Sequence, residues 1–382
     1  MALSRPVIVT AIGTTQTLAW ASSYYVPAIL AEPMARDLGL APSTVFGVFS
    51  GALLLTALLG PTVGRIIDTK GGRGILAASN LVFAAGLALL GLSDSLAGLI
   101  LAWAVLGVGM AMGLYDSAFA TLAGLYGREA RASITGVTLI AGFASTVGWP
   151  ASAWLNGVVG WQGACFVWAA LHIVIGLPLN RLLIPPAPPP APASEATGEA
   201  PPAPRGAMAL LAFVFASTWF VTSAMAAHLP ELLRATGASA AAAVFAGMLV
   251  GPAQVAARIF EFSLMRRFHP LASARMAAAF HPIGAAILLL VGAPAASAFA
   301  LLHGAGNGLL TIAKGTLPLA IFGPVGYGLR SGLLSVPARG TQAAAPFLFG
   351  LVLERFGANI AVLLSSALCG SALIPLMVLE GA

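Results

Sequence analysis

The sequence predicts an all-α membrane protein with twelve transmembrane helices in two pseudo-repeated six-helix bundles. Of its 382 residues, 59% are hydrophobic and only 8% are charged, whereas a soluble globular protein carries roughly 25% charged residues. Apolar runs recur along the chain with short polar loops between them, and each is long enough, at about 20 residues, to cross the hydrocarbon core as a helix. This composition excludes a soluble protein with a water-exposed surface.

The apolar runs give the expected helices in order. The first run follows Arg5 and lacks a small-residue cleavage site, so it is a membrane helix rather than a signal peptide. The turn at Lys70–Gly72 separates the second run from the third, and the fifth run follows Gly127–Ala132. The twelve expected helices span residues 7–30, 44–67, 74–92, 96–125, 132–157, 163–184, 207–229, 240–265, 274–291, 296–321, 329–353 and 358–379.

A Pro/Ala-rich segment at 185–206 is the one long polar interruption of this pattern. It contains the run Pro188–Pro190 and then small and acidic residues, a composition that cannot pack a core and stays extended. We therefore expect an N-terminal six-helix bundle at 1–184, a linker at 185–206 and a C-terminal six-helix bundle at 207–382.

The distribution of Lys and Arg predicts the orientation in the membrane. Cytoplasmic loops carry an excess of these residues, and the loops on the side of the N-terminus hold most of them. The sequence therefore predicts a multi-pass protein of the cytoplasmic (inner) membrane with both termini and the linker in the cytoplasm, and the net charge of +6 reflects topology rather than a nucleic-acid partner. The residues on that side are Arg5, Arg65, Lys70, Arg73, Arg128, Arg131, Arg181, Arg205, Arg266, Arg267, Arg275 and Arg330, against Arg36, Arg234 and Arg355 on the other.

A short internal sequence similarity indicates that the two halves are related. The end of the second expected helix, Gly60–Asp68, resembles the end of the eighth, Arg258–Arg267. Repeated halves are common in secondary transporters, whose solute site lies near the bilayer midplane between the repeats.

The segment Gly64–Arg73 lies in the loop after the second expected helix and reads G-x-x-x-D-x-x-G-x-R. It resembles the signature of the major facilitator superfamily, and this resemblance implies the major facilitator fold. It also implies that Asp68 is a gate residue that pairs with arginine and helix N-termini in the outward-facing state, with Gly64, Arg65 and Arg73 around it. The alternative is a charged loop that only fixes topology.

Within that superfamily the N-terminal half is similar to the monocarboxylate transporters and the oxalate:formate antiporters. The similarity rests on Ser22–Leu30 with Asp37–Leu40, and on Gly127–Ala132 with Gly148–Pro150. It implies an arginine in the eighth helix and a basic residue in the eleventh, positions that Arg258 and Arg339 occupy. Gln254 stands where monocarboxylate transporters carry an aspartate four residues before the arginine, so this pair is not expected to carry a proton.

Three basic residues lie inside expected helices of the C-terminal half, namely Arg258, Lys314 and Arg339. A charge near the bilayer centre costs at least about 2.5–3.5 kcal/mol on insertion scales, so such residues indicate function. Together they predict an electropositive site for a carboxylate or another oxyanion. Two alternatives stay open: Glu261 can neutralise Arg258 from one turn away, and Lys314 can snorkel to the interface.

Two acidic residues are candidates for proton coupling. Asp116, beside Tyr115 in the fourth expected helix, lies deep in an apolar run where burial favours the protonated form. Glu261 is the second candidate. A salt bridge from Asp116 to Arg339 or Arg258 is the alternative.

Uncharged polar residues complete the expected substrate site. His303 and Asn307 lie one turn apart and are expected to face a cavity, whereas buried, hydrogen-bonded histidine is the expected role of His172, His228 and His281. In the first helix, Gln16 and Tyr24 are about two turns apart and are expected to share a face. Tyr25 is a further candidate substrate-binding residue.

These observations predict a secondary active transporter that moves a small organic anion, monocarboxylate-like, by alternating access. The alternatives are proton-coupled efflux of drugs or toxic metalloid compounds, and a transport-dead membrane sensor. No enzymatic motif, metal site or cofactor is expected. The expected partners are a small-molecule substrate, the lipid bilayer, and protons or a counter-anion, with no nucleic acid, and the protein is expected to act as a monomer.

Overall fold

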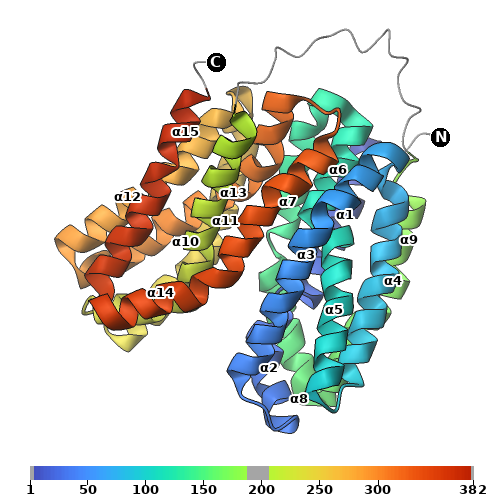
Figure 1. Ribbon diagram of the computed structural model, residues 1–382, viewed down its shortest axis with the longest axis horizontal. Helices are drawn as coiled ribbons and strands as arrows, with labels where there is room; N and C mark the ends of the chain where they lie inside the picture. The colour runs from blue at the N-terminus through green and yellow to red at the C-terminus, as the bar shows by residue number, and fades with distance from the viewer. Residues whose placement is uncertain (1–3, 187–205, 380–382) are drawn as a thin grey trace. The chain divides into compact units, whose positions relative to one another are not determined.

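The computed structural model describes residues 4–186 and 206–379, and these residues form helices joined by short turns without any strand (Figure 1). This confirms the predicted all-α class. The predicted linker at 185–206 lies almost wholly outside the described residues. Eight helical stretches in the described part of the chain are long and apolar enough to cross a membrane, and large apolar side chains such as Leu290, 86% exposed, cover their outer faces. The chain is therefore an integral multi-pass membrane protein.

The chain divides into two compact units. Unit 1 consists of Met1–Thr197 together with Gly323–Leu333, and unit 2 consists of Gly198–Phe322 and Leu334–Ala382. Most of each unit comes from one half of the sequence, but a short segment of the C-terminal half, Gly323–Leu333, packs with unit 1. The exact bundle boundaries at 184 and 207 remain a prediction.

The helices of unit 1 begin where the chain chemistry favours it. Pro6, Pro27 and Pro42 each stand in the first turn of a helix, where the missing N–H has no partner to lose, and the Ser95 hydroxyl accepts a hydrogen bond from the Gly98 amide at 3.3 Å. The helices are α1 (Arg5–Ser22), α2 (Val26–Asp37), α3 (Pro42–Lys70), α4 (Gly72–Gly91), α5 (Leu96–Gly113), α6 (Tyr115–Tyr126), α7 (Ala130–Ala141), α8 (Ala144–Leu171) and α9 (Leu177–Leu182), with a 3₁₀ turn at Gly127–Glu129 and a π-helical turn at His172–Gly176.

Unit 2 holds the remaining helices, and two of them have side-chain caps. Ser239 accepts a hydrogen bond from the Ala242 amide at 3.2 Å, and His269 accepts one from the Leu271 amide at 3.3 Å. The helices are α10 (Ala207–Ala235), α11 (Ala240–Ser263), α12 (Pro270–Val291), α13 (Ala296–Phe322), α14 (Tyr327–Ser371) and α15 (Leu373–Val378), with 3₁₀ turns at Met265–Arg267 and Ala293–Ala295. The first turns of α14 belong to unit 1 and the rest of the helix to unit 2.

Some of the predicted helices are interrupted. The prediction of one helix over 7–30 was wrong because the ring of Pro27 excludes a helical carbonyl at Ser23, so that α1 ends at Ser22. The predicted helix 96–125 breaks at Leu114, whose backbone is extended (φ −88°, ψ −173°).

Side chains satisfy the carbonyl groups that the break at Leu114 releases. The Gln16 side chain donates to the Gly113 carbonyl at 2.6 Å, and the Ser117 hydroxyl donates to the Ala111 carbonyl at 2.8 Å. A break inside a membrane helix is tolerated when such groups replace the lost backbone bonds. A shorter interruption, at Gly142 and Phe143, separates α7 from α8 inside the predicted helix 132–157.

Two glycines end membrane-spanning segments inside long helical stretches. Gly160 in α8 has φ 74° and ψ 171°, and Gly357 in α14 has φ 81° and ψ 173°. This backbone conformation is essentially restricted to glycine. Each glycine lies in the gap between two predicted helices, and each occupies the corresponding place in its half of the chain.

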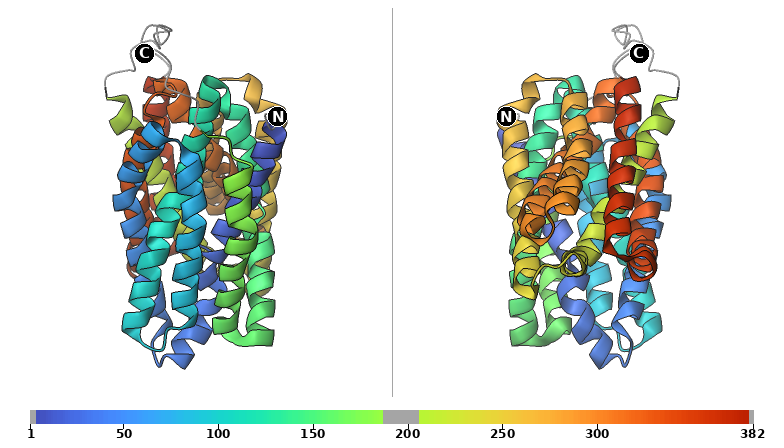
Figure 2. Two further views of the ribbon diagram at one scale, coloured as in Figure 1. Left: turned by 90° about the vertical axis from the view of Figure 1, so that its right-hand side faces the viewer. Right: turned by 90° about the vertical axis from the view of Figure 1, so that its left-hand side faces the viewer.

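The blue-to-green helices of unit 1 run alongside one another (Figure 2). In unit 1, α5 packs against α3 and α4. Glycine permits this close approach, because a Cβ atom at Gly107 would lie 2.8 Å from the Ala52 carbonyl oxygen of α3.

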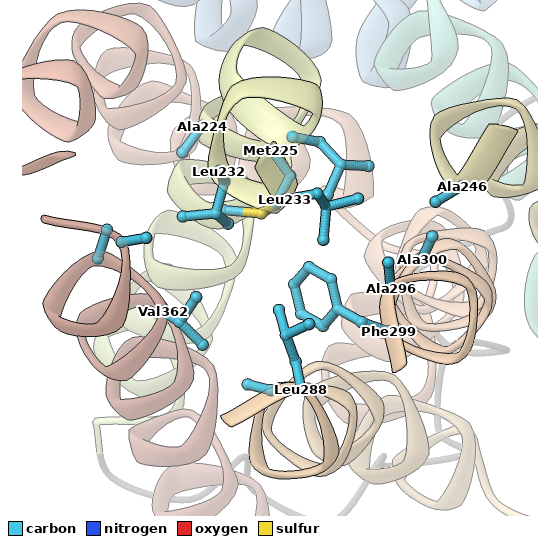
Figure 3. Packing of buried hydrophobic residues seen from close by; sticks show 14 of the residues in the cluster. Ala224, Met225, Leu232, Leu233, Ala246, Leu288, Ala296, Phe299, Ala300 and Val362 are labelled. Atoms are coloured by element: carbon cyan, nitrogen blue, oxygen red, sulfur yellow. The ribbon is translucent and has the colours of Figure 1, made fainter. Parts of the chain in front are cut away.

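In unit 2, α13 packs between α11 and α12, and the core consists of two apolar clusters. The Phe299 cluster joins residues of α10, α12, α13 and α14, with the Phe299 ring directed toward Leu233 and Leu288 (Figure 3). The Leu309 cluster joins Val214, Ala278, Leu309, Leu317 and their neighbours farther along the same helices. Polar side chains lie between the two clusters.

The close packing at Gly107 predicts a stability effect. Gly107→Ala places a methyl group against the Ala52 carbonyl, and overpacking of this kind typically costs about 1–3 kcal/mol. We expect a lower melting temperature in detergent, measured by intrinsic fluorescence. The matched control is Gly51→Ala in α3, where a Cβ atom has no neighbour within 4 Å and helix propensity favours alanine. Equal melting temperatures of the two variants would show that this helix contact is loose.

Candidate functional site

Asp68, in the last turn of α3, binds the N-terminus of α14. Its Oδ1 accepts a hydrogen bond from the Gly328 amide at 2.7 Å, and its Oδ2 accepts one from the Leu329 amide at 2.8 Å. These amides are among the first of the helix and have no partner within it. A carboxylate at this position is also stabilised by the helix dipole. Asp68 therefore fixes the start of α14 against α3.

The backbones of α3 and α14 approach closely beside this contact. Cβ atoms at Gly64 and Gly328 would each overlap the main chain of the other helix, so both positions require glycine. A Cβ atom at Gly332 would lie 2.6 Å from the Gly60 carbonyl oxygen. The close approach of the two helices therefore explains why the first residue of the signature segment, Gly64, is a glycine.

The two arginines of the signature segment do not form an ion pair with Asp68 among the described residues. Arg65 is exposed, and Arg73 donates from Nε to the Arg181 carbonyl at 3.0 Å, which joins α4 to α9. The helix N-terminus, not an arginine, is the partner of the Asp68 carboxylate.

Asp116 lies in the first turn of α6, directly after the break at Leu114. It is half-buried, and its role in proton coupling stays a prediction. The fully buried Tyr327, at the start of α14, lies within electrostatic reach of both Asp116 and Asp68. Unit 1 therefore brings Asp116 and the gate candidate Asp68 close to the same short segment of α14.

Tyr24 and Tyr25 lie in the turn between α1 and α2 and belong to an aromatic group. Ring centroids are 5.2 Å apart for Trp20 and Tyr24, 5.4 Å for Tyr24 and Tyr25, and 4.9 Å for Trp20 and Tyr115. Because α1 ends at Ser22, the expectation that Gln16 and Tyr24 share a helix face was wrong. Gln16 is instead buried and bonded to the Gly113 carbonyl.

The three intramembrane cations are all buried in unit 2. Arg258, Lys314 and Arg339 are 5%, 7% and 5% exposed. Arg258 contacts the Thr311 hydroxyl from a terminal guanidinium nitrogen at 3.5 Å, and its Nε has no hydrogen-bond partner among the described residues. The Lys314 ammonium lies 5.5 Å from the centroid of the Trp219 ring in α10, which is a cation–π contact. Lys314 therefore points into the unit and does not snorkel.

Arg339 lies where α14 is bonded to α10. The Thr341 hydroxyl donates to the Ala216 carbonyl at 2.9 Å, and the Ser223 hydroxyl donates to the Gln342 carbonyl at 2.8 Å. These bonds follow Arg339 within the next turn and fix its helix against the same stretch of α10 that carries Trp219.

Glu261 is fully buried and accepts a hydrogen bond from the Ser273 hydroxyl of α12 at 2.5 Å. Among the described residues, no ion pair joins it to Arg258, so a direct salt bridge between them, one of the alternatives left open by the sequence, is not observed. Glu261 joins α11 to α12 near the end of the unit.

Polar side chains recur along one face of α13. His303, Asn307, Thr311 and Lys314 are spaced by four, four and three residues, which places them on one side of a helix. Asn307 accepts from the Thr222 hydroxyl of α10 at 3.3 Å. These four residues of α13 therefore line one side of the candidate site. Asn307 joins them to α10 and Thr311 joins them to α11.

At the His303 end of this face, His303 contacts His281 of α12. His281 Nδ1 lies 3.0 Å from His303 Nδ1, and His281 Nε2 lies 3.0 Å from the Ser365 hydroxyl. A cavity of about 20 Å³ adjoins them and is lined by His281, His303, Asn307, Thr218, Thr222 and Cys369 among others. His172 of unit 1 is similarly buried and bonded to Ser22 and Asn80, at 2.8 and 2.9 Å, as expected for these residues.

Sequence reasoning missed the residues that complete these contacts. Trp219, Thr222, Thr311 and Ser365 are polar or aromatic residues within apolar runs. The signal that was available is the helical spacing of His303, Asn307, Thr311 and Lys314, of which only the first pair was recognised.

Comparisons with known proteins agree with this arrangement. The human organic anion transporter MFSD10 (TETRAN) has a similar structure, with a TM-score of 0.74 and 17% identity over 99% of this chain and 100% of that chain. FucP in the outward conformation has a TM-score of 0.74 and 13% identity over 97% of this chain and 98% of that chain. The proton:xylose symporter XylE has a TM-score of 0.73 and 14% identity over 97% of this chain and 95% of that chain. At these identities the likeness establishes the fold.

No curated protein matches the sequence significantly. The sequence model of the Major Facilitator Superfamily, however, matches residues 12–309, more than half of the chain. The chain therefore belongs to the Major Facilitator Superfamily.

Proposed function

We propose that this transporter of a small solute carries a small organic anion, monocarboxylate-like, by alternating access as a secondary active transporter. The observation that carries the proposal is the burial of Arg258, Lys314 and Arg339 in the membrane-spanning helices of unit 2. Among the described residues of that unit, Glu261 is the only buried carboxylate. Unit 2 thus has an excess of buried positive charge.

Such an excess is expensive in a bilayer unless an anion compensates it. Each buried cation costs at least about 2.5–3.5 kcal/mol on insertion scales. A bound carboxylate recovers this cost by charge-assisted hydrogen bonds, and an arginine can offer two parallel N–H groups to its two oxygens. The Arg258 Nε, which has no partner among the described residues, is a donor available for such a ligand.

Two further points favour a carboxylate. The N-terminal half resembles the monocarboxylate and oxalate:formate transporters in the segments Ser22–Leu30 and Gly127–Ala132. Of the structures with a similar fold, one is titled an organic anion transporter, whereas two others are titled transporters of fucose or xylose. Neutral sugars would not require three buried cations, so the charge favours the anion.

We assign the gate to Asp68 and its contact with α14. The first turns of α14 pack with unit 1 through this carboxylate, while the rest of the helix belongs to unit 2. Release of Asp68 would free α14 and change the equilibrium between outward-facing and inward-facing states. In this proposal the protein lies in the cytoplasmic (inner) membrane with both termini in the cytoplasm, because most basic loop residues lie on that side.

Proton-coupled efflux of drugs is the second candidate, and the aromatic group of unit 1 favours it. Trp20, Tyr24, Tyr25 and Tyr115 pack with ring centroids about 5 Å apart, and Asp116 follows Tyr115 directly. Aromatic faces and a carboxylate attract organic cations. In the anion proposal, Gln16, Tyr24 and Tyr25 instead contact the uncharged part of the solute.

Arg339→Gln tests the anion proposal. We expect uptake of radiolabelled acetate, lactate or succinate into proteoliposomes to fall at least roughly tenfold, because a hydrogen bond to a charged group contributes about 1.5–3 kcal/mol. Arg258→Gln should act in the same direction. The control is Arg267→Gln, since Arg267 is basic but exposed. If the Arg339→Gln variant takes up every tested anion as fast as the parent protein, the proposal is contradicted.

Asp68→Asn tests the gate. The amide retains the shape of the side chain but removes the charge at the N-terminus of α14, a loss of about 0.3–1 kcal/mol of dipole stabilisation and therefore up to about a fivefold shift between states. We expect faster labelling of single cysteines introduced along α14 near Leu333. Asp94→Asn, at an exposed loop aspartate, is the control. Identical labelling rates in all three proteins would remove the gate role.

Asp116→Asn separates the two candidate functions. If the protein exports cationic drugs by proton exchange, Asp116→Asn should abolish drug transport in inverted membrane vesicles. In that case the parent protein should also show no anion uptake. In the anion proposal, the parent protein does not transport cationic dyes such as ethidium, and the substitution changes nothing in that assay.

A further inference from the structure

The polar layer of unit 2 separates its two apolar clusters. On α12, Ala278 belongs to the Leu309 cluster and Ala285 to the Phe299 cluster, with His281 between them. On α13, His303 occupies the same place between Ala300 and Leu309. His281 is 2% exposed and Ser365 is fully buried. A buried polar layer in a membrane helix bundle is costly and therefore indicates a function.

The hydrogen-bond network determines where protons lie in this layer. The Ser365 hydroxyl donates to the Val362 carbonyl at 2.9 Å, so its oxygen accepts from His281 Nε2–H. His281 Nδ1 then carries a lone pair and accepts from His303 Nδ1–H at 3.0 Å. These tautomers follow from the network. They leave a lone pair on His303 Nε2.

His303 also lines the cavity of about 20 Å³, together with Asn307 and Thr222. A cavity needs about 10–15 Å³ to hold one water molecule, together with two to four polar partners. The imidazole, the amide and the hydroxyl supply such partners. A hydronium ion in the cavity can give one proton to His303 Nε2 and remain as water, while both existing N–H groups stay in place and the two rings share one positive charge.

The groups around the His281–His303 pair include no carboxylate of the described residues that line the cavity, which favours coupling of the proton to an anion. The helices packed against the histidines contribute Thr218 and Thr222 from α10, and Ser365 and the Cys369 thiol from α14. No carboxylate lines the cavity among the described residues. The nearest cations are Arg258, bonded to Thr311 eight residues along α13, and Lys314 beyond it.

The positive charges of Arg258 and Lys314 oppose the charging of the histidines, and an anion bound beside them weakens this opposition. Eight residues of helix correspond to about 12 Å. At that separation and an effective dielectric constant of about 20, one unit charge changes the proton affinity of the pair on the order of tenfold. An anion bound at Arg258 or Lys314 weakens this repulsion. Anion and proton therefore bind to unit 2 together.

We propose that His281 and His303 form a proton-binding site whose occupation is coupled to that of the anion, which makes the protein a proton–anion symporter. The coupling rests on the proposed function, whereas the proton site rests on the geometry of the pair alone. It replaces Asp116 and Glu261 as the site of proton coupling.

The proton site is tested by NMR of detergent-purified protein labelled with ¹³C at histidine Cε1, with His281→Gln and His303→Gln for assignment. As the pH falls from 8 to 4.5, the two resonances of the pair should shift together with one midpoint, and His303→Gln should remove the shift of His281. His172, which is also buried and hydrogen-bonded, is the internal reference and should not titrate. If neither His281 nor His303 titrates, the proposal is overturned whichever solute the protein carries.

The coupling is tested in proteoliposomes with acetate, lactate and succinate as probes. We measure uptake driven by an inward proton gradient and divide it by exchange at equal pH. His281→Gln should lower this ratio at least tenfold, and Ser365→Ala should lower it less, while His172→Gln retains the parent ratio. An unchanged ratio in His281→Gln overturns the coupling. If the parent transports none of the anions but the pair titrates, the anion proposal fails and the proton site stands.

Discussion

The absence of water in the bilayer core is the constraint on which the rest of the structure depends. Every backbone amide and carbonyl must find a partner within the protein, which is why the described chain is mostly helical. At the helix break at Leu114, the side chains of Gln16 and Ser117 donate hydrogen bonds to the carbonyl groups that the break releases. The same constraint makes each buried charge costly. Polar groups are therefore few, and several of those in unit 2 lie along one face of α13, where His303, Asn307 and Thr311 contact polar groups of neighbouring helices.

This face explains how one helix can serve two ligands. At one end, Lys314 and Arg258 carry positive charge in a medium of low dielectric constant, and at the other the two histidines accept a proton. The charges are near enough to influence one another and far enough apart to bind separate ligands. Family membership and fold do not specify a solute, since similar structures carry sugars as well as organic anions. The charge of these side chains is therefore the feature on which the anion proposal rests.

The sequence was sufficient for the features that depend on local composition. Apolar runs predicted the helices, Gly160 and Gly357 fell in the predicted gaps, and Arg258, Lys314 and Arg339 stood out because charge is rare in such runs. Contacts between distant segments were beyond it. Asp68 was recognised by its motif, but its partners lie about 260 residues away at Gly328 and Leu329. The breaks at Ser22 and Leu114 were missed because the few polar residues there, Ser22–Tyr25 and Asp116, are too short an interruption to divide an apolar run. The pairing of His281 with His303 depends on the rotation of two helices, which a single sequence does not specify.

The most direct test of the account is a ligand screen by thermal shift on the detergent-purified protein, with Arg339→Gln beside the parent. The ligands are small mono- and dicarboxylates, inorganic phosphate and cationic drugs. A ligand at 100 times its dissociation constant stabilises a protein by about 2.7 kcal/mol, which such a scan detects readily. The account predicts that a carboxylate or phosphate raises the melting temperature of the parent and not that of the variant. Stabilisation by cationic drugs alone, equal in both proteins, would contradict it and identify an exporter of cations.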